Sequence, residues 1–246
     1  MLFIIILILL FFFYAGKQLP KLGTALGKKA RKPYRQAKWM WALFSGTEKE
    51  SLRAEEEFGQ ECAREFSKQF DGTASLQDKE LVSSIGERLA KMVKGPRRNF
   101  HFSIVASSTA NAFALPGGFV FMTTRLLDMC DRQQDEIAFF LGHEIAHIAC
   151  GHAKDRMTAD ALLTAVAARL AGAGGLLKQV LSKGYSRSME LDADKQGAQL
   201  MKAAGFDTQA SAQALLRMTE ASPDLSGLME YFLSHPSIKE SIRALA

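Results

Sequence analysis

The sequence predicts an α+β fold that is mainly helical, with a small three-stranded sheet and a short membrane helix at its N-terminus. The chain has 246 residues, 48% of them hydrophobic, which is enough to bury one full core. Apolar residues recur at helical spacing over most of the chain, and one window, 100–122, instead shows the alternation of strands. The first fifteen residues are apolar without a break. These observations divide the chain into a membrane anchor, 1–16, a basic amphipathic segment, 17–47, and a folded domain, 48–246.

The apolar run at residues 1–15 would form a helix about 22 Å long, shorter than the roughly 30 Å hydrocarbon core of a bilayer. Basic residues follow this run and none precedes it, which favours a retained anchor over a cleaved signal peptide. By the positive-inside rule, the sequence predicts a single-pass protein of the bacterial inner membrane, with everything after Lys17 in the cytoplasm. A periplasmic domain is the alternative.

The same N-terminal region resembles the first segment of TatA-type subunits of the twin-arginine translocase. The apolar run is followed by Gly16-Lys17-Gln18-Leu19-Pro20 and then by Ala25-Leu26-Gly27-Lys28. The resemblance covers about forty residues and implies a short membrane helix, a Gly/Pro hinge and a basic helix on the cytoplasmic face. Pro33 would interrupt that basic helix, so an anchor is expected and not a translocation pore. An accessory role in twin-arginine transport is an alternative function.

The positive charge of the chain is confined to this segment. The formal net charge is +5, but eight Lys and Arg residues precede the first acidic residue, Glu48, which leaves 23 basic and 26 acidic residues in the remainder. No nucleic-acid partner is therefore expected, and anionic lipid headgroups are the predicted partner of the basic segment. The three cysteines, Cys62, Cys130 and Cys150, form no CxxC pair and predict no disulfide framework.

The elements of the folded domain follow from periodicity and from Gly/Pro punctuation. Strands are expected over 100–105, 111–115 and 119–122, and the Gly117-Gly118 turn joins the last two. Helices are expected over 48–69, 76–93, 133–150, 156–171, 175–183, 188–204, 208–220 and 237–245.

The predicted helix 133–150 carries the sequence His143-Glu144-Ile145-Ala146-His147, an HExxH motif. Positions i and i+4 of a helix share a face, so both imidazoles can reach one Zn²⁺ while Glu144 projects toward a water molecule beside it. The surrounding residues are apolar, and buried imidazoles and carboxylates need strong compensation, which a metal ion supplies. His143 and His147 are therefore predicted zinc ligands and Glu144 the catalytic base. A pair of core histidines without a metal is the alternative.

A catalytic zinc site has a third protein ligand and one position open to water. Glu190 and Asp194 lie four residues apart on the predicted helix 188–204 and share a face, whereas Asp192 points elsewhere. The spacing alone also fits an ordinary solvated acidic face.

Three motifs in order are similar to those of the HtpX-like and CAAX-prenyl-protease family of gluzincin peptidases. They are Asn111-Ala112-Phe113-Ala114-Leu115-Pro116-Gly117-Gly118, HExxH, and the Ser-Arg-x-x-Glu-x-x-Ala-Asp pattern that contains Glu190 and Asp194. The resemblance covers residues 48–246 and implies a zincin-like metallopeptidase domain with one Zn²⁺ per chain. It also implies that Glu190 is the third ligand and that Asp194 orients a histidine ligand.

The resemblance further implies how substrate binds. In the family an edge strand pairs with the substrate backbone, and here that strand contains Asn111, Ala112, Phe113 and Ala114. Unfolded or membrane proteins are thus the expected substrates, in a role in protein quality control. A homo-oligomer is left open.

Two further histidines lie outside this set. His235, in Ser234-His235-Pro236, resembles the His-Pro motif of the family, which implies a catalytic histidine that stabilises the oxyanion or, in some relatives, fills the open position of the metal. A chaperone-like or autoinhibited metalloprotein is the alternative function in the second case, and helix capping is the alternative role. Ser241 stands where the family has an arginine six residues later, and Arg243 lies two positions further, on another helix face, so the resemblance does not extend to an arginine that stabilises the oxyanion. His152 is expected to be structural because it falls on the wrong side of the HExxH helix.

Overall fold

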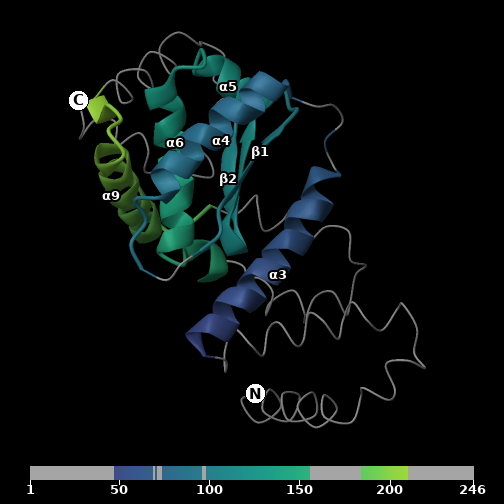
Figure 1. Cartoon of the computed structure of the whole chain (residues 1–246), viewed down its shortest axis with the longest axis vertical. Helices are drawn as coiled ribbons and strands as arrows, with labels where there is room; N and C mark the ends of the chain where they lie inside the picture. The colour runs from purple at the N-terminus through teal and green to yellow at the C-terminus, as the bar shows by residue number, and fades with distance from the viewer. Residues whose placement is uncertain (1–46, 69, 71–73, 96–97, 156–183, 210–246) are drawn as a thin grey trace. The chain divides into compact units, whose positions relative to one another are not determined.

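The computed structural model describes residues 47–68, 70, 74–95, 98–155 and 184–209 (Figure 1). The chain divides into two compact units, residues 1–58 and 59–246. The predicted anchor, the basic segment and the helices expected at 156–171, 175–183 and 237–245 lie outside the described residues, as does all but the start of the helix expected at 208–220. Within the described ranges, no helix combines the length and the apolar character that a membrane span requires.

Four of the described helices were predicted from periodicity. They are α3 (Glu48–Ser67), α4 (Leu76–Ala90), α6 (Gln134–Ala149) and α9 (Arg187–Ala203). Each begins or ends within three residues of the predicted boundary. Side-chain caps explain two of the starts, because Ser75 accepts a hydrogen bond from the backbone N–H of Asp78 and Ser186 accepts one from that of Met189.

A short fifth helix, α5 (Thr124–Met129), was not predicted. It follows a strand directly, and six residues are too few to establish a helical period. The hydroxyl of Thr123 accepts a hydrogen bond from the N–H of Leu126 and starts the helix.

The three predicted strands are present as β1 (His101–Val105), β2 (Ala112–Leu115) and β3 (Phe119–Thr123). Their order in the sheet is β1-β3-β2, with β3 parallel to β1 and antiparallel to β2. The short turn η1 (Pro116–Gly118) joins β2 to β3. Gly118 has a φ of 96°, and a Cβ there would lie 1.9 Å from the carbonyl oxygen of Asn99, so only glycine fits this turn. The prediction of a mainly helical fold with a three-stranded sheet is confirmed.

Helix α6 lies at the centre of the second unit. It packs against β2 and β3 on one side and against α4 and α9 on others (Figure 1). The side chains of Ala112 and Ala114 on β2 are small and fully buried, which allows the strand to lie close to the helix. Every residue of α6 from Glu136 to Ile148 is buried. The HExxH motif therefore lies in the interior, where its polar groups must satisfy one another or bind a cation.

Glycines allow α6 and α9 to approach closely. A Cβ at Gly197 on α9 would lie 3.1 Å from the carbonyl carbon of Gly142 on α6, and a Cβ at Gly142 would lie 3.3 Å from the carbonyl oxygen of Gly197. The two backbones are thus nearly in contact one residue before His143. This approach brings Glu190, seven residues earlier on α9, within reach of the α6 histidines.

We expect Gly197→Ala to destabilise the protein by about 1–3 kcal/mol, the usual cost of forcing an extra methyl group into a packed interior. Urea unfolding followed by circular dichroism measures the change. Gln199→Ala, on an exposed face of the same helix, is the matched control and should change stability by less than about 0.5 kcal/mol. Equal effects of the two substitutions would show that the close approach is not tight.

Candidate metal centre and active site

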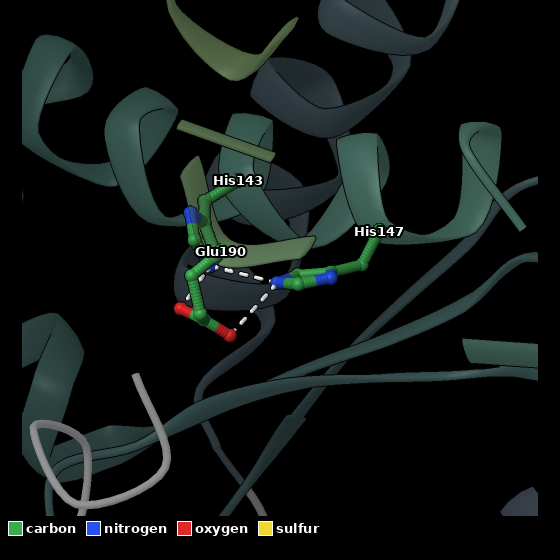
Figure 2. Close-up of side chains that lie close together, drawn as sticks. All are labelled: His143, His147 and Glu190. Atoms are coloured by element: carbon green, nitrogen blue, oxygen red, sulfur yellow. Dashed lines mark hydrogen bonds and ion pairs between the residues drawn. The ribbon is translucent and has the colours of Figure 1, made fainter. Parts of the chain in front are cut away.

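Helix α6 supplies two imidazoles that face each other. His143 and His147 are 2% and 0% exposed, and their Nε2 atoms lie 3.0 Å apart. One helical turn separates the two residues, so their side chains lie on one face of the helix. Both Nε2 atoms point toward the same point in space (Figure 2).

Glu190 approaches that point from the first turn of α9. Its side chain is completely buried, with Oε2 at 3.6 Å from Nε2 of His143 and Oε1 at 3.5 Å from Nε2 of His147 (Figure 2). A carboxylate in the first turn of a helix is stabilised by the helix dipole, which partly offsets the cost of its burial.

The separations of these atoms match a tetrahedral metal site. A zinc ion about 2.0–2.1 Å from each ligand holds the ligand atoms about 3.3 Å from one another. The two Nε2 atoms are 3.0 Å apart, and each lies 3.5 or 3.6 Å from an oxygen of the Glu190 carboxylate, a different oxygen for each histidine. Two imidazoles and one carboxylate also form the donor set of a catalytic zinc, with one position left for water. His143, His147 and Glu190 therefore fit a zinc ion by both geometry and chemistry.

Asp194 holds His143 in the orientation that a metal requires. Its Oδ1 lies 2.8 Å from Nδ1 of His143, so the Nδ1–H donates to the carboxylate and Nε2 keeps its lone pair for a cation. Burial alone lowers the pKa of His143, but the hydrogen bond to Asp194 and the charges of Glu144 and Glu190 outweigh burial and raise that pKa above its ordinary value. The surroundings of His143 thus favour positive charge.

We expect Asp194→Asn to lower zinc affinity by about 10- to 100-fold, the usual effect of removing a partner that orients a histidine ligand. The asparagine keeps the shape of the side chain but loses the charge. Competition with a chromogenic chelator measures the affinity. Lys195→Ala, at the neighbouring exposed position, should leave the affinity unchanged, and an unchanged affinity in Asp194→Asn as well would contradict the orienting role.

His147 is held by two residues that the sequence did not connect to it. The ring of Tyr185 stacks on the His147 ring with centroids 3.7 Å apart, and Nδ1 of His152 lies 3.2 Å from Nδ1 of His147. Because α6 ends at Ala149 and Gly151 adopts a φ of 81°, the chain reverses and returns His152 to the metal face. The contact between His152 and His147 was not predicted. As predicted, His152 is not part of the group His143, His147 and Glu190. It remains outside the ligand set, since it contacts the nitrogen of His147 that faces away from Glu190.

The remaining predicted site residues are Glu144, the four residues of the predicted substrate-binding strand, and His235. Glu144 is 0% exposed and lies between the two histidines in sequence, and its charge acts on His143. Ala112, Phe113 and Ala114 lie in β2, which packs against α6, and Asn111 precedes the strand by one residue. His235 lies outside the described residues, so its role stays a prediction.

The profile of peptidase family M48 matches residues 76–246, more than half of the chain. The chain belongs to peptidase family M48. The matched region contains HExxH and all of α9, so the predicted metallopeptidase is confirmed at the level of the family. The finer resemblance to HtpX-like and CAAX-prenyl-protease members, and the resemblance to TatA, stay predictions.

This M48 peptidase is similar to several curated proteins. Mitochondrial metalloendopeptidase OMA1 of Schizosaccharomyces pombe is 31% identical over 172 residues, which are 67% of this chain and 51% of the relative. The beta-barrel assembly-enhancing protease of Yersinia pestis is 28% identical over 175 residues, 64% of this chain and 36% of the relative. Metalloprotease YcaL of Escherichia coli K12 is 30% identical over 175 residues, 64% of this chain and 67% of the relative. The chain thus spans about half the length of the first relative and about a third of the second.

Proposed function

We propose that this M48 peptidase is a zinc-dependent endopeptidase that is anchored in a membrane and cleaves unfolded or misfolded proteins. The convergence of His143, His147 and Glu190 in the interior supports this proposal most strongly. The three relatives named above are all proteases, which supports peptide hydrolysis, and one is named for assembly of beta-barrel proteins, which supports a role in protein quality control.

Each of the five site residues on α6 and α9 has a defined task in this proposal. His143, His147 and Glu190 would hold the metal, and Asp194 would keep His143 in the metal-binding tautomer. A zinc ion bound there would supply Lewis acidity, polarising the scissile carbonyl and lowering the pKa of water to about 7. Glu144 takes the proton from the attacking water and later delivers it to the leaving amine. The burial of His143, Glu144, His147 and Glu190 excludes bulk water and strengthens these electrostatic effects.

Strand β2 is suited to hold the substrate backbone. It lies at one edge of the described sheet, paired on one side with β3. Both the N–H and the C=O of Asn111 are directed to Thr123, the last residue of β3: the N–H donates to its Oγ1 and the C=O accepts from its backbone N–H, both at 2.9 Å. Because these directions alternate along an antiparallel strand, the backbone groups of Ala112 and Ala114 point away from β3. These groups would form hydrogen bonds with an extended substrate.

This binding mode predicts that substrates are recognised through their backbone. A peptide N-methylated at a residue that pairs with β2 loses one donor, and each lost hydrogen bond costs about 0.5–1.5 kcal/mol, or 2- to 12-fold in kcat/KM. The measurement is kcat/KM for one cleaved peptide and for two sets of its variants, one N-methylated and one alanine-substituted at each position in turn. Backbone methylation at alternate positions should reduce cleavage, whereas most side-chain changes should not. Strong dependence on side chains with tolerance of methylation would contradict β-pairing.

The proposal as a whole is tested by comparing two forms of one protein substrate. The full chain loaded with zinc should cleave the reduced and alkylated form and spare the native form, and a chelator should stop the cleavage until zinc is restored. A membrane location rests on the sequence of residues 1–47, and a topology reporter at the C-terminus decides between the cytoplasmic and periplasmic sides. Absence of cleavage of any unfolded protein by metal-loaded chain would favour the chaperone-like alternative.

A further inference from the structure

A second group of metal-binding side chains lies beside the first. It consists of Cys150, His152 and Asp192, whose ligand atoms all lie within 4.8 Å of one another. Nε2 of His152 is 3.6 Å from Oδ2 of Asp192, and the Sγ of Cys150 lies within 4.8 Å of the ligand atoms of both. In a tetrahedral site with bonds of about 2.0–2.3 Å, ligand atoms are about 3.3–3.7 Å apart. The group therefore needs only a small contraction to close around a cation.

The local fold explains how these residues meet. Cys150 caps the C-terminus of α6, and Gly151, with its φ of 81°, reverses the chain so that His152 turns back beside it. Asp192 comes from α9 and lies two residues after Glu190, so it projects from a different face of that helix. The His152 side chain is 10% exposed and the Asp192 side chain is 47% exposed. His152 is thus largely enclosed by the fold, whereas Asp192 faces solvent, so a cation can reach the group from the Asp192 side.

We propose that Cys150, His152 and Asp192 form a second site, for a thiophilic divalent cation such as Zn²⁺ or Cd²⁺, and that its occupation weakens metal binding by His143, His147 and Glu190. A cysteine, a histidine and a carboxylate form a donor set that suits zinc and its congeners and disfavours Mg²⁺ and Ca²⁺. On binding, the Cys150 thiol releases its proton to solvent, and water completes the coordination.

The opposition between the two sites follows from the contact between His147 and His152. Their Nδ1 atoms are 3.2 Å apart, a hydrogen bond in which one ring donates and the other accepts. A metal on Nε2 of His147 leaves the hydrogen on Nδ1 of that ring, so His152 must accept. A cation on Nε2 of His152 likewise places a hydrogen on its own Nδ1. With both sites filled, two N–H groups would face each other, so each cation disfavours the other. The site itself is independent of the proposed peptidase function, and the opposition rests on the metal centre of that function.

The experiment uses the full chain loaded with one equivalent of Zn²⁺ and titrated with Cd²⁺. Thiolate–Cd²⁺ charge-transfer absorption in the ultraviolet reports on a cysteine ligand, and the first site contains none. We expect this absorption to saturate at one equivalent in the wild-type chain and to be absent in Cys150→Ser. Cys62→Ser, at a buried cysteine, is the matched control and should keep the absorption. Asp192→Asn is a second variant, expected to weaken Cd²⁺ binding at least 10-fold while the thiol remains.

Peptidase activity is measured in the same samples. The second equivalent of cation should reduce activity at least 10-fold in the wild-type chain and leave Cys150→Ser unaffected. Wild-type chain without the absorption, or Cys150→Ser that retains it, would overturn the second site. Absorption without loss of activity would overturn the opposition alone. If the wild-type chain showed no peptidase activity in any sample, that result would count against the proposed function. The thiolate–Cd²⁺ absorption would still show whether the second site binds a cation.

Discussion

Glu144→Gln is expected to lower kcat for an unfolded protein substrate by about 10³-fold, within the 10²–10⁴-fold range of general acid–base catalysis. The glutamine has the same shape as Glu144 but cannot take a proton from water. The ligands His143, His147 and Glu190 are untouched, so the variant should still bind one zinc ion per chain. The measurement is initial cleavage rate with metal content determined on the same preparation.

The control for this substitution is Glu80→Gln, the same chemical change at an exposed position of α4. It should leave both the rate and the zinc content unchanged. If Glu144→Gln cleaved at the wild-type rate with zinc bound, another group would have to be the base. If it lost zinc, Glu144 would instead be needed to hold the metal.

In the Cys150→Ser background, where the second proposed site cannot contribute, Glu190→Gln is expected to abolish stoichiometric zinc binding, with a loss of affinity of more than about 100-fold. Removing a partner of a ligand already costs 10- to 100-fold, and a missing ligand costs more. Zinc at 1,000 times its dissociation constant stabilises the folded chain by about 4 kcal/mol. For a protein of this size that corresponds to roughly 10 °C in Tm. A chelator should therefore lower the Tm of the Cys150→Ser chain by about this amount and leave that of the same chain with Glu190→Gln unchanged.

For each variant, the Tm with chelator is compared with the Tm of the same variant without chelator. This comparison removes any effect that the substitution has on the stability of the metal-free fold. Glu87→Gln, in the same background and on the exposed face of α4, is the matched control and should respond to chelator as the Cys150→Ser chain does. A Glu190→Gln variant that lost stability to chelator by the same amount would show that the carboxylate is not a ligand.

The sequence was informative about the site because the chemistry is encoded in local spacing. The i,i+4 spacing of His143 and His147 places both on one face of α6 whatever the rest of the fold does. Glu190 could be named only because three motifs occur together, since an acidic helix face by itself is common on protein surfaces. The structure brings its carboxylate to within 3.6 Å of both histidines.

The strands were predicted in place but their order was not. Alternation identifies β1, β2 and β3 one at a time, and the Gly117-Gly118 turn identifies the β2–β3 hairpin. That β3 also pairs with β1, in parallel, depends on how α4 and α6 pack against the sheet. Sequence period carries no information about such long-range packing.

The contacts around His147 were missed for a related reason. A helical pattern predicts where side chains point only while the helix continues, and Gly151 ends that pattern by adopting a left-handed conformation. The Cys150-Gly151 pair was the available signal, because glycine directly after an apolar helix marks its C-terminus. The stacking of Tyr185 on His147 had no signal, since it joins two segments 38 positions apart in the chain.

X-ray absorption spectroscopy at the zinc edge tests the central claim most directly. The sample is the full chain with Cys150→Ser and one equivalent of zinc, so that the second proposed site cannot contribute. We predict a first shell of nitrogen and oxygen only, at about 2.0–2.1 Å, with outer-shell scattering from two imidazoles that falls to one in His147→Ala. A shell without imidazole scattering, or one that His147→Ala leaves unchanged, would contradict a metal held by His143, His147 and Glu190.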